Sequence, residues 1–252
     1  MKRIGLLFVI LPVLALFSCG NSGSSTEVNG STTADDVAVC IWDNISLRDA
    51  PTESGKWLSA LSIGETVEYL NETEVDETPK TPITYYKIRL KDDKEGWVRS
   101  DFIVIASEPA TFTNDCPIYS RPDLLNKTDK QFSAMDIVAV KSESNGFLEV
   151  TGKRSDGKWV ETGWVKDQAL TYTDVDIAVA KFIRKAMELT DEAKKAEAIK
   201  EIVENPDFKE SVFVSRLASA QEEAVEEITT EVEEVIAEPN TEDIATDTID
   251  VE

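Results

Sequence analysis

The most reactive side chains of this chain are three cysteines and 49 carboxylates. Histidine is absent, which excludes Ser-His and Cys-His nucleophile pairs and His-ligated zinc. The sequence has no glycine-rich phosphate-binding loop, and we expect no cofactor. Two carboxylates that share a pocket can still act as acid and base, so an unrecognised carboxylate hydrolase stays open as one alternative.

Cys19 has the sequence context of a lipid-attachment site. A basic start and an apolar run, Ile4 to Leu16, precede it, and the small Ser18 stands directly before the thiol. The run has 13 residues, fewer than the roughly 20 that span a bilayer. The segment Leu16 to Cys19 resembles the lipobox of bacterial lipoproteins, which implies lipidation of Cys19. The alternative is an ordinary cleaved signal followed by a coincidental cysteine.

This resemblance divides the start of the chain into a signal peptide, residues 1–18, and a flexible Gly/Ser tether, residues 19–35. It implies export to the bacterial cell envelope and anchoring to a membrane through lipid, the outer membrane in a Gram-negative cell. Outside the cytosol, Cys40 and Cys116 can form a disulfide. Two buried, reduced cysteines are the alternative.

The charge of the chain is strongly negative, with a net charge of -23 and a pI near 4.4. Such a field repels polyanions, so we expect no nucleic-acid partner. Residues 221–252 carry 13 Asp and Glu and no Lys or Arg. We expect residues 237–252 to form a disordered acidic tail. Solvation and reach are one interpretation of this tail, and binding of divalent cations or a basic partner is the other.

Two short sequences, Gly96-Trp97-Val98-Arg99 and Gly163-Trp164-Val165-Lys166, repeat about 70 residues apart. Further segments match in the same order: Leu47 and Pro51 with Ile118 and Pro122, and residues 56–61 with residues 130–135. The apolar runs between them are short, rich in Val, Ile, Tyr and Phe, and bounded by turn residues, a pattern typical of strands. The repeat predicts two tandem copies of a small all-β barrel.

The first copy resembles a bacterial SH3-type (SH3b) domain in the order of its motifs: Leu47-Arg48-Asp49-Ala50-Pro51, Gly64-Glu65-Thr66-Val67, Tyr86-Lys87-Ile88 and Gly96-Trp97-Val98. This copy covers residues 36–106. A second, more divergent copy covers residues 109–171, where Tyr119 replaces Arg48 and Gly64 has no clear counterpart. The resemblance implies two SH3-like β-barrels that bind varied ligands.

Aromatic side chains are the candidates for ligand contact, because SH3-like folds hold extended peptides in aromatic grooves. We predict Trp42, Trp57 and Tyr85 as ligand-binding residues. Trp97 and Trp164 are expected in or near the core, since small barrels need large side chains to build one. No residue is predicted to bind a metal.

Two segments are predicted to differ from a plain barrel. Residues 70–84 hold four acidic side chains and two prolines, which predicts a long, mobile acidic loop. Residues 174–236 predict a helical region, in which Thr173 or Asp174 caps the first helix and Asn205-Pro206 ends the second. The first helix has an apolar stripe: Val175, Val179, Phe182, Ala186 and Leu189. We expect it to pack within the chain, and a face for a partner is the alternative.

The expected fold class is mainly β, then α: two small SH3-like β-barrels followed by a short helical region and a disordered acidic tail. The expected function is that of a non-catalytic envelope lipoprotein. It displays its barrels to bind a cell-wall peptide or an envelope protein. One alternative is a structural protein that oligomerises through its C-terminal helices, and the other is the carboxylate hydrolase.

Overall fold

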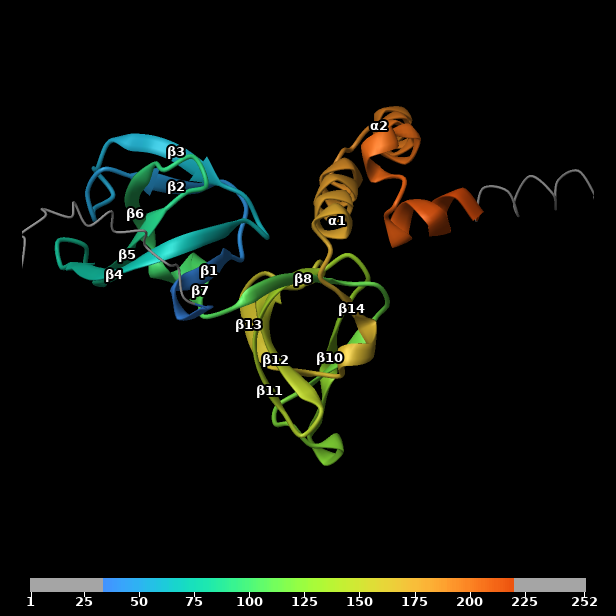
Figure 1. Ribbon diagram of the computed structural model, residues 1–252, viewed down its shortest axis with the longest axis horizontal. Coiled ribbons are helices and arrows are strands. Elements are labelled where there is room, and N and C mark those ends of the chain that lie inside the picture. Colours follow the sequence, from blue (N-terminus) through green and yellow to red (C-terminus); the bar gives the residue numbers. More distant parts are fainter. Residues whose placement is uncertain (1–33, 220–252) are drawn as a thin grey trace, which may run out of the picture. The chain divides into compact units, whose positions relative to one another are not determined.

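The computed structural model describes residues 34–219 (Figure 1). These residues form two seven-stranded antiparallel sheets followed by helices. The predicted signal peptide, the tether up to residue 33 with Cys19, the helical region beyond residue 219 and the acidic tail all lie outside the described residues.

The first sheet contains β1 (Val37–Cys40), β2 (Ile45–Arg48), β3 (Trp57–Leu61), β4 (Thr66–Asp76), β5 (Ile83–Arg89), β6 (Glu95–Arg99) and β7 (Ile103–Ile105). The second contains β8 (Glu108–Phe112), β9 (Cys116–Tyr119), β10 (Lys127–Phe132), β11 (Ile137–Ser144), β12 (Phe147–Lys153), β13 (Val160–Val165) and β14 (Leu170–Thr171). The helices are α1 (Asp174–Met187), α2 (Glu192–Glu204) and a segment over residues 212–219.

The two sheets have the same strand order. The first runs β3-β2-β6-β5-β4-β1-β7 and the second β10-β9-β13-β12-β11-β8-β14, so each strand has a counterpart seven strands later. Each sheet is strongly curved (Figure 1) and encloses its own apolar core. The sequence repeat therefore corresponds to a repeat of topology.

The register of the strands corrects one part of the predicted repeat. Leu61 pairs with Ile45 in the first sheet, and Phe132 pairs with Cys116 in the second. Phe132 is therefore the counterpart of Leu61, and the match of residues 56–61 with 130–135 was wrong by three residues. Both strand pairs are also irregular: the register shifts between Leu47 and Arg48 in the first sheet and between residues 127 and 131 in the second.

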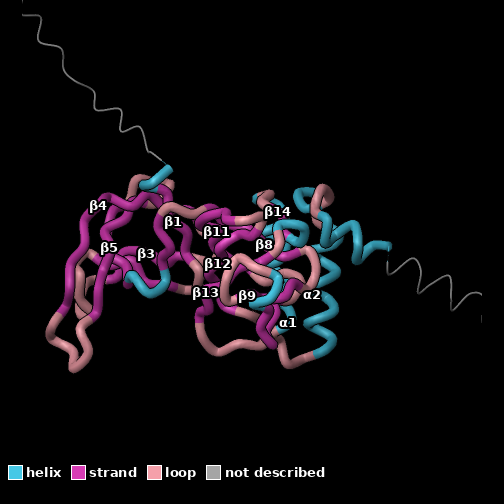
Figure 2. The backbone as a smooth tube through the Cα atoms, turned by 90° about the horizontal axis from the view of Figure 1, so that it is seen from below, coloured by secondary structure: helices cyan, strands magenta, loops and turns pink. Residues whose placement is uncertain are grey.

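The predicted acidic loop over residues 70–84 is also corrected, because most of it is strand. Strands β4 and β5 pair along a hairpin, with Glu74 opposite Tyr85 and Asp76 opposite Ile83. Only residues 77–82 connect the strands, and Figure 2 shows the hairpin as an extended arm. Backbone pairing stabilises these strands. Glu72, Glu74 and Glu77 stay exposed, and Glu72 pairs with Lys87 at 2.7 Å. Asp76 is buried and accepts hydrogen bonds from the amide and the hydroxyl of Thr78.

The helices begin and end where their capping residues predict. The Thr173 side chain accepts a hydrogen bond from the Asp176 amide at the start of α1, and Asp191 caps α2. Helix α2 ends at Glu204, before Asn205-Pro206. Within residues 34–219, no helix is long and apolar enough to cross a membrane.

The stripe predicted for α1 was partly wrong. Its buried apolar side chains are Ile177, Val179, Ala180, Ile183 and Ala186, whereas Phe182 is 43% exposed. The buried set packs with Ile137 of β11 and with Phe213 and Val214 of the last helical segment. The helical region therefore packs on the second sheet, within the chain, a choice of surface that the sequence did not predict.

Asp176 connects these parts through hydrogen bonds. Its carboxylate accepts from the hydroxyls of Thr171 (2.7 Å), Thr173 (2.6 Å) and Ser211 (2.8 Å) and from the Val212 amide (2.9 Å). A buried carboxylate is stable only when its oxygens are satisfied in this way. The interaction joins the end of β14, the start of α1 and the start of the last helical segment.

Candidate ligand-binding surface

A row of four side chains crosses the outer face of the first sheet. Arg48 of β2 lies opposite Trp57 of β3 on one side and opposite Trp97 of β6 on the other, and Trp97 lies opposite Lys87 of β5. Residues directly opposite one another share a face of the sheet and have adjacent side chains. We name these four residues the aromatic-cationic row.

Alternation along the strands places the row away from the core. Leu47 and Val98 are fully buried in the first core. Arg48 and Trp97 follow or precede them by one residue and thus face outward. Gly96 lets β2 approach, because a Cβ at this position would lie 2.6 Å from the carbonyl oxygen of Arg48. The Gly-Trp pair therefore both closes the strand contact and sets the indole on the outer face.

Trp57 is the most accessible member of the row, with 58% of its surface exposed. Arg48 is held in place because its Nη1 donates to the Gly55 carbonyl at 2.7 Å. Lys87 pairs with Glu72 at 2.7 Å, and this hydrogen bond raises the pKa of Lys87. The row thus offers an exposed, flat indole beside the cation of Arg48, which suits a ligand that carries an apolar group near a carboxylate.

Tyr85 of β5 was predicted to bind the ligand. It lies opposite Arg99 of β6, and only 2% of the Tyr85 surface is exposed. Burial is the main reason that the pKa of its hydroxyl is raised, followed by the charge of Glu53. In this structure its side chain offers no contact surface to a ligand.

The model of the bacterial SH3 domain family matches residues 43–104. This match spans β2 to β6 and contains all four residues of the row. The chain contains a bacterial SH3 domain. A comparison with curated proteins gave no match.

Ten solved chains match parts of this chain. NlpC2 from Trichomonas vaginalis is 12% identical, with a TM-score of 0.23 over 60% of this chain and 55% of that one. NlpC1 from Trichomonas vaginalis is 13% identical, with a TM-score of 0.23 over 60% of this chain and 52% of that one. The native structure of CBDP35 is 12% identical, with a TM-score of 0.16 over 54% of this chain and 96% of that one. The chain spans about half the length of the two NlpC proteins.

Trp42, the third predicted contact residue, lies at the other end of the SH3 domain from Trp57. It stands three residues before Ile45, which pairs with Leu61, whereas Trp57 pairs with Arg48 at the far end of β2. Its half-buried ring packs on the first core, with its centroid 5.7 Å from that of Phe102. The structure therefore separates Trp42 and Trp57 into two sites.

Cys40 and Cys116 are both free and buried. Cys40 belongs to the core of the first sheet and Cys116 to that of the second, so the disulfide considered from the sequence is not formed. Burial raises the pKa of the Cys40 thiol to about 12 and also raises that of Cys116. Both cysteines act as small apolar core residues.

Arg48 and Lys87 were not predicted as site residues. The strand alternation around Leu47 and Ile88 already placed them on the outer face, since both apolar neighbours are buried. The pairing of Arg48 with both tryptophans depends on register, which the sequence motifs alone do not give.

Proposed function

We propose that this chain is a non-catalytic binding protein that recognises an extended peptide through the outer face of its bacterial SH3 domain. The observation that supports this is Trp57, an exposed indole adjacent to Arg48 in the bacterial SH3 domain. Trp57 anchors an apolar side chain of the ligand, and Arg48 pairs with its carboxylate. A cell-wall peptide or an exposed peptide of an envelope protein carries both groups.

The second sheet is, in this proposal, a divergent second module of the same kind. Its support is the identical strand order and the Gly163-Trp164 pair at the position of Gly96-Trp97. It lacks the exposed indole of the row and serves to hold the SH3 domain and the helices. Most of the apolar stripe of α1 packs inside the chain, which favours a binding role over assembly through α1.

Catalysis has less support than binding. Burial raises the pKa of the Asp136 carboxyl, as a general acid requires, but its exposed fraction is 0%. It accepts hydrogen bonds from the amides of Ser133 (2.8 Å) and Ser155 (2.9 Å), and so it is a structural group.

The proposal also includes export and lipidation of Cys19, which would hold the binding domain at a membrane. Replacing Cys19 by Ser is expected to move the protein from the membrane fraction to the soluble fraction of the cell envelope. Retention of the variant in the membrane fraction would show that the lipid anchor is not the cause of attachment.

Binding is tested by co-sedimentation of the purified protein with insoluble peptidoglycan and by titration with soluble fragments of its peptides. The variant Trp57→Ala should weaken binding about 30-fold, since truncating an aromatic anchor costs about 2 kcal/mol or more. The matched control is Trp159→Ala, because Trp159 is 78% exposed and lies in the second sheet's region. An equal loss in both variants, or no loss in either, would overturn the assignment of the row.

A further inference from the structure

A cationic pocket lies between the two sheets and α1. Its volume is about 240 Å³, and four of its lining residues are cationic: Lys153 of β12 and Lys181, Arg184 and Lys185 of α1. Trp42, outside the aromatic-cationic row, forms an aromatic wall. Neither the SH3 match nor the proposed peptide surface accounts for this cluster.

The fold brings these cations together from distant parts of the sequence. Lys181, Arg184 and Lys185 are spaced three and four residues apart, so they share one face of α1. Lys153 comes from the second sheet, and its Nζ lies 4.6 Å from the centroid of the Trp42 ring in the first. This cation-π contact places the Lys153 charge beside the indole rather than in open solvent.

The pocket keeps an excess of positive charge. Arg184 pairs with buried Asp136 at 3.2 Å. Lys153, Lys181 and Lys185 form no ion pair with any carboxylate of residues 34–219. Asp43 and Glu188 also line the pocket. Three unpaired lysines in one pocket repel one another, although the chain carries a net charge of -23.

An anion in the pocket would relieve this repulsion. The volume is below the roughly 300–1,000 Å³ of pockets that enclose drug-sized ligands, which limits the occupant to a small anion or to a few side chains of a longer one. Lysine ammonium groups bind carboxylate and phosphate oxygens as point charges. The Trp42 ring adds a surface for the apolar part of the same ligand.

We propose that this pocket is a binding site for a small oxyanion with at least two carboxylate or phosphate groups. The anion contacts Lys181 and Lys185 on one side and the Lys153–Trp42 pair on the other. Two sources have the same chemistry: a free small anion, and the carboxylates of residues 221–252, where 13 Asp and Glu occur without Lys or Arg. The site is independent of the peptide surface around Trp57.

The test is titration of the full-length protein with citrate at low ionic strength, followed by the NMR signal of the Trp42 indole N–H. Trp42→Phe assigns this signal among the five tryptophans. We expect a saturable shift, and Lys181→Gln with Lys185→Gln should raise the Kd about tenfold or more. The control pair is Lys200→Gln with Lys209→Gln, two exposed lysines outside the pocket, whose Kd should stay within about twofold.

The absence of a saturable shift up to about 10 mM citrate, in a range where the weakest specific sites bind, would overturn the proposal. So would an equal loss of affinity in the control pair. If the double variant does not fold, as judged from its amide spectrum, Lys153→Gln takes its place. Loss of peptide binding in Trp57→Ala leaves these results unchanged, so the two sites are tested separately.

A second variant distinguishes the two sources. In it, the 13 Asp and Glu of residues 221–252 become Asn and Gln. If these carboxylates occupy the pocket, the Trp42 signal of the unligated protein should move and citrate should bind more tightly than to the unmodified chain. If the occupant is a free anion, the Trp42 signal of the unligated protein should be unchanged, whereas the Kd alone does not separate the sources because the lower net charge favours citrate in either case.

Discussion

The two sheets share one framework but differ on the outer face. In the first, the row across the strands is Trp57, Arg48, Trp97 and Lys87; its counterpart in the second is Lys127, Tyr119, Trp164 and Glu149. Only the tryptophan after glycine is kept. The exposed indole becomes a lysine, and both cations are lost. Strand order and core therefore constrain the residues that face inward, whereas the outer face is free to carry a ligand site in one sheet only.

The turn before β4 and β11 shows the same relation. Gly64 (φ +78°) and Met135 (φ +67°) adopt the left-handed conformation at equivalent positions. The next residue is acidic in both sheets and accepts a hydrogen bond from an amide three residues earlier: Glu65 from Ser62 at 2.9 Å, and Asp136 from Ser133 at 2.8 Å. Met135 is thus the counterpart of Gly64 that the sequence did not reveal.

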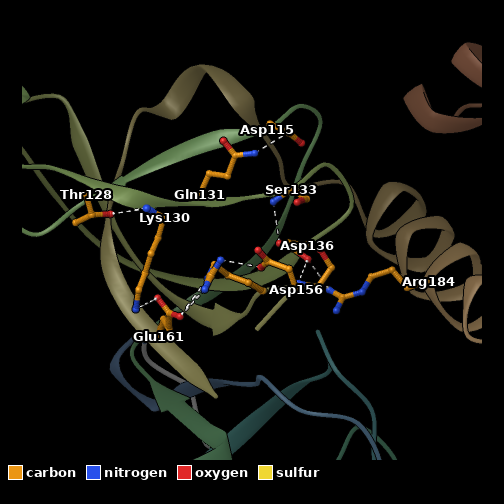
Figure 3. Close-up of polar contacts among 11 residues, drawn as sticks. Asp115, Thr128, Lys130, Gln131, Ser133, Asp136, Asp156, Glu161 and Arg184 are labelled. Atoms are coloured by element: carbon orange, nitrogen blue, oxygen red, sulfur yellow. Dashed lines mark hydrogen bonds and ion pairs between the residues drawn. The ribbon is translucent and has the colours of Figure 1, made fainter. Parts of the chain in front are cut away.

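The second turn has an added function. Asp136 also accepts a hydrogen bond from the Ser155 amide at 2.9 Å. It pairs with Arg184 of α1 at 3.2 Å, as Figure 3 shows. Its carboxylate joins the turn, the β12–β13 connection and the helix. Asp136, which has the shorter side chain, is buried, whereas its counterpart Glu65 in the first sheet is half-buried. The same turn therefore closes a strand pair in one sheet and fixes a helix in the other.

Replacing the acidic residue of each turn by alanine should give the largest difference in unfolding free energy between the two sheets. Asp136→Ala leaves two amides and Arg184 without their acceptor and should cost about 3 kcal/mol of unfolding free energy. Glu65→Ala removes one bond and should cost about 1 kcal/mol. Amide hydrogen exchange in β11 and β4, measured against denaturant, resolves the two sheets. Equal costs would mean that the helix contact adds no stability.

Replacing the glycine of the repeated Gly-Trp pair by alanine should give a smaller difference in unfolding free energy between the two sheets. A Cβ on Gly96 would lie 2.6 Å from a backbone oxygen, that of Arg48, whereas one on Gly163 would lie 2.5 Å from a side-chain carbon, Cγ2 of Ile118. The clash at Gly163 displaces one buried side chain, whereas the clash at Gly96 displaces the backbone of β2 and thus its pairing with β6. Gly96→Ala should therefore cost about 2 kcal/mol and Gly163→Ala about 1 kcal/mol, as measured by urea denaturation. The reverse order would show that the strand backbone yields more easily than Ile118.

Exchanging Gly64 and Met135, the residues with positive φ in the two turns, should change the unfolding free energy by different amounts in the two directions. Gly64→Met should cost about 2 kcal/mol, because a Cβ there would lie 2.9 Å from Ile177 Cγ2 and because positive φ is unfavourable for a side chain. Met135→Gly relieves that conformation and loses some packing, so its net effect should stay within about 1 kcal/mol. Thermal unfolding of the two variants gives the comparison. A neutral Gly64→Met would show that α1 shifts readily at the first turn.

The sequence predicted the parts of the fold that local chemistry determines. The Gly-Trp repeats, the cap at Thr173 and the helix end at Asn205-Pro206 depend on short-range geometry, and the structure has them in place. Register and long-range contact were not predictable in the same way. Trp42 and Trp57 are close in sequence but lie at opposite ends of β2, and Tyr85 is buried by neighbours that the strand pattern does not identify.

The acidic hairpin shows why composition alone misled. Residues 70–84 have the acids and prolines of a loop, yet pairing between β4 and β5 satisfies their backbone groups. Glu72, Glu74 and Glu77 stay exposed, and the buried Asp76 is satisfied by Thr78. The sequence predicted Trp57 of the aromatic-cationic row as a ligand-binding residue, but it did not predict Arg48. Its identity as a site depends on cross-strand neighbours, which a single sequence does not specify.

The dependence of stability on pH should distinguish the two buried aspartates at the helical end of the second sheet. Burial acts to raise the pKa of Asp176, but the bonds from Thr173, Thr171, Ser211 and the Val212 amide outweigh it and lower the pKa. Burial raises the pKa of Asp136 in spite of its amide bonds and Arg184.

When folding lowers the pKa of a carboxyl group, the group stabilises the protein above its unfolded pKa, and this stability is lost as the pH falls toward the folded pKa. When folding raises the pKa, stability is lost as the pH rises from the unfolded pKa to the folded pKa. Asp176→Asn should therefore remove a loss of stability seen below the ordinary pKa of an aspartate. Asp136→Asn should remove a loss of stability that develops as the pH rises above that value. Unfolding free energies measured from acid to neutral pH test both signs. Identical slopes in the two variants would show that the hydroxyl and amide donors around Asp176 do not favour its charged form more than the surroundings of Asp136 do.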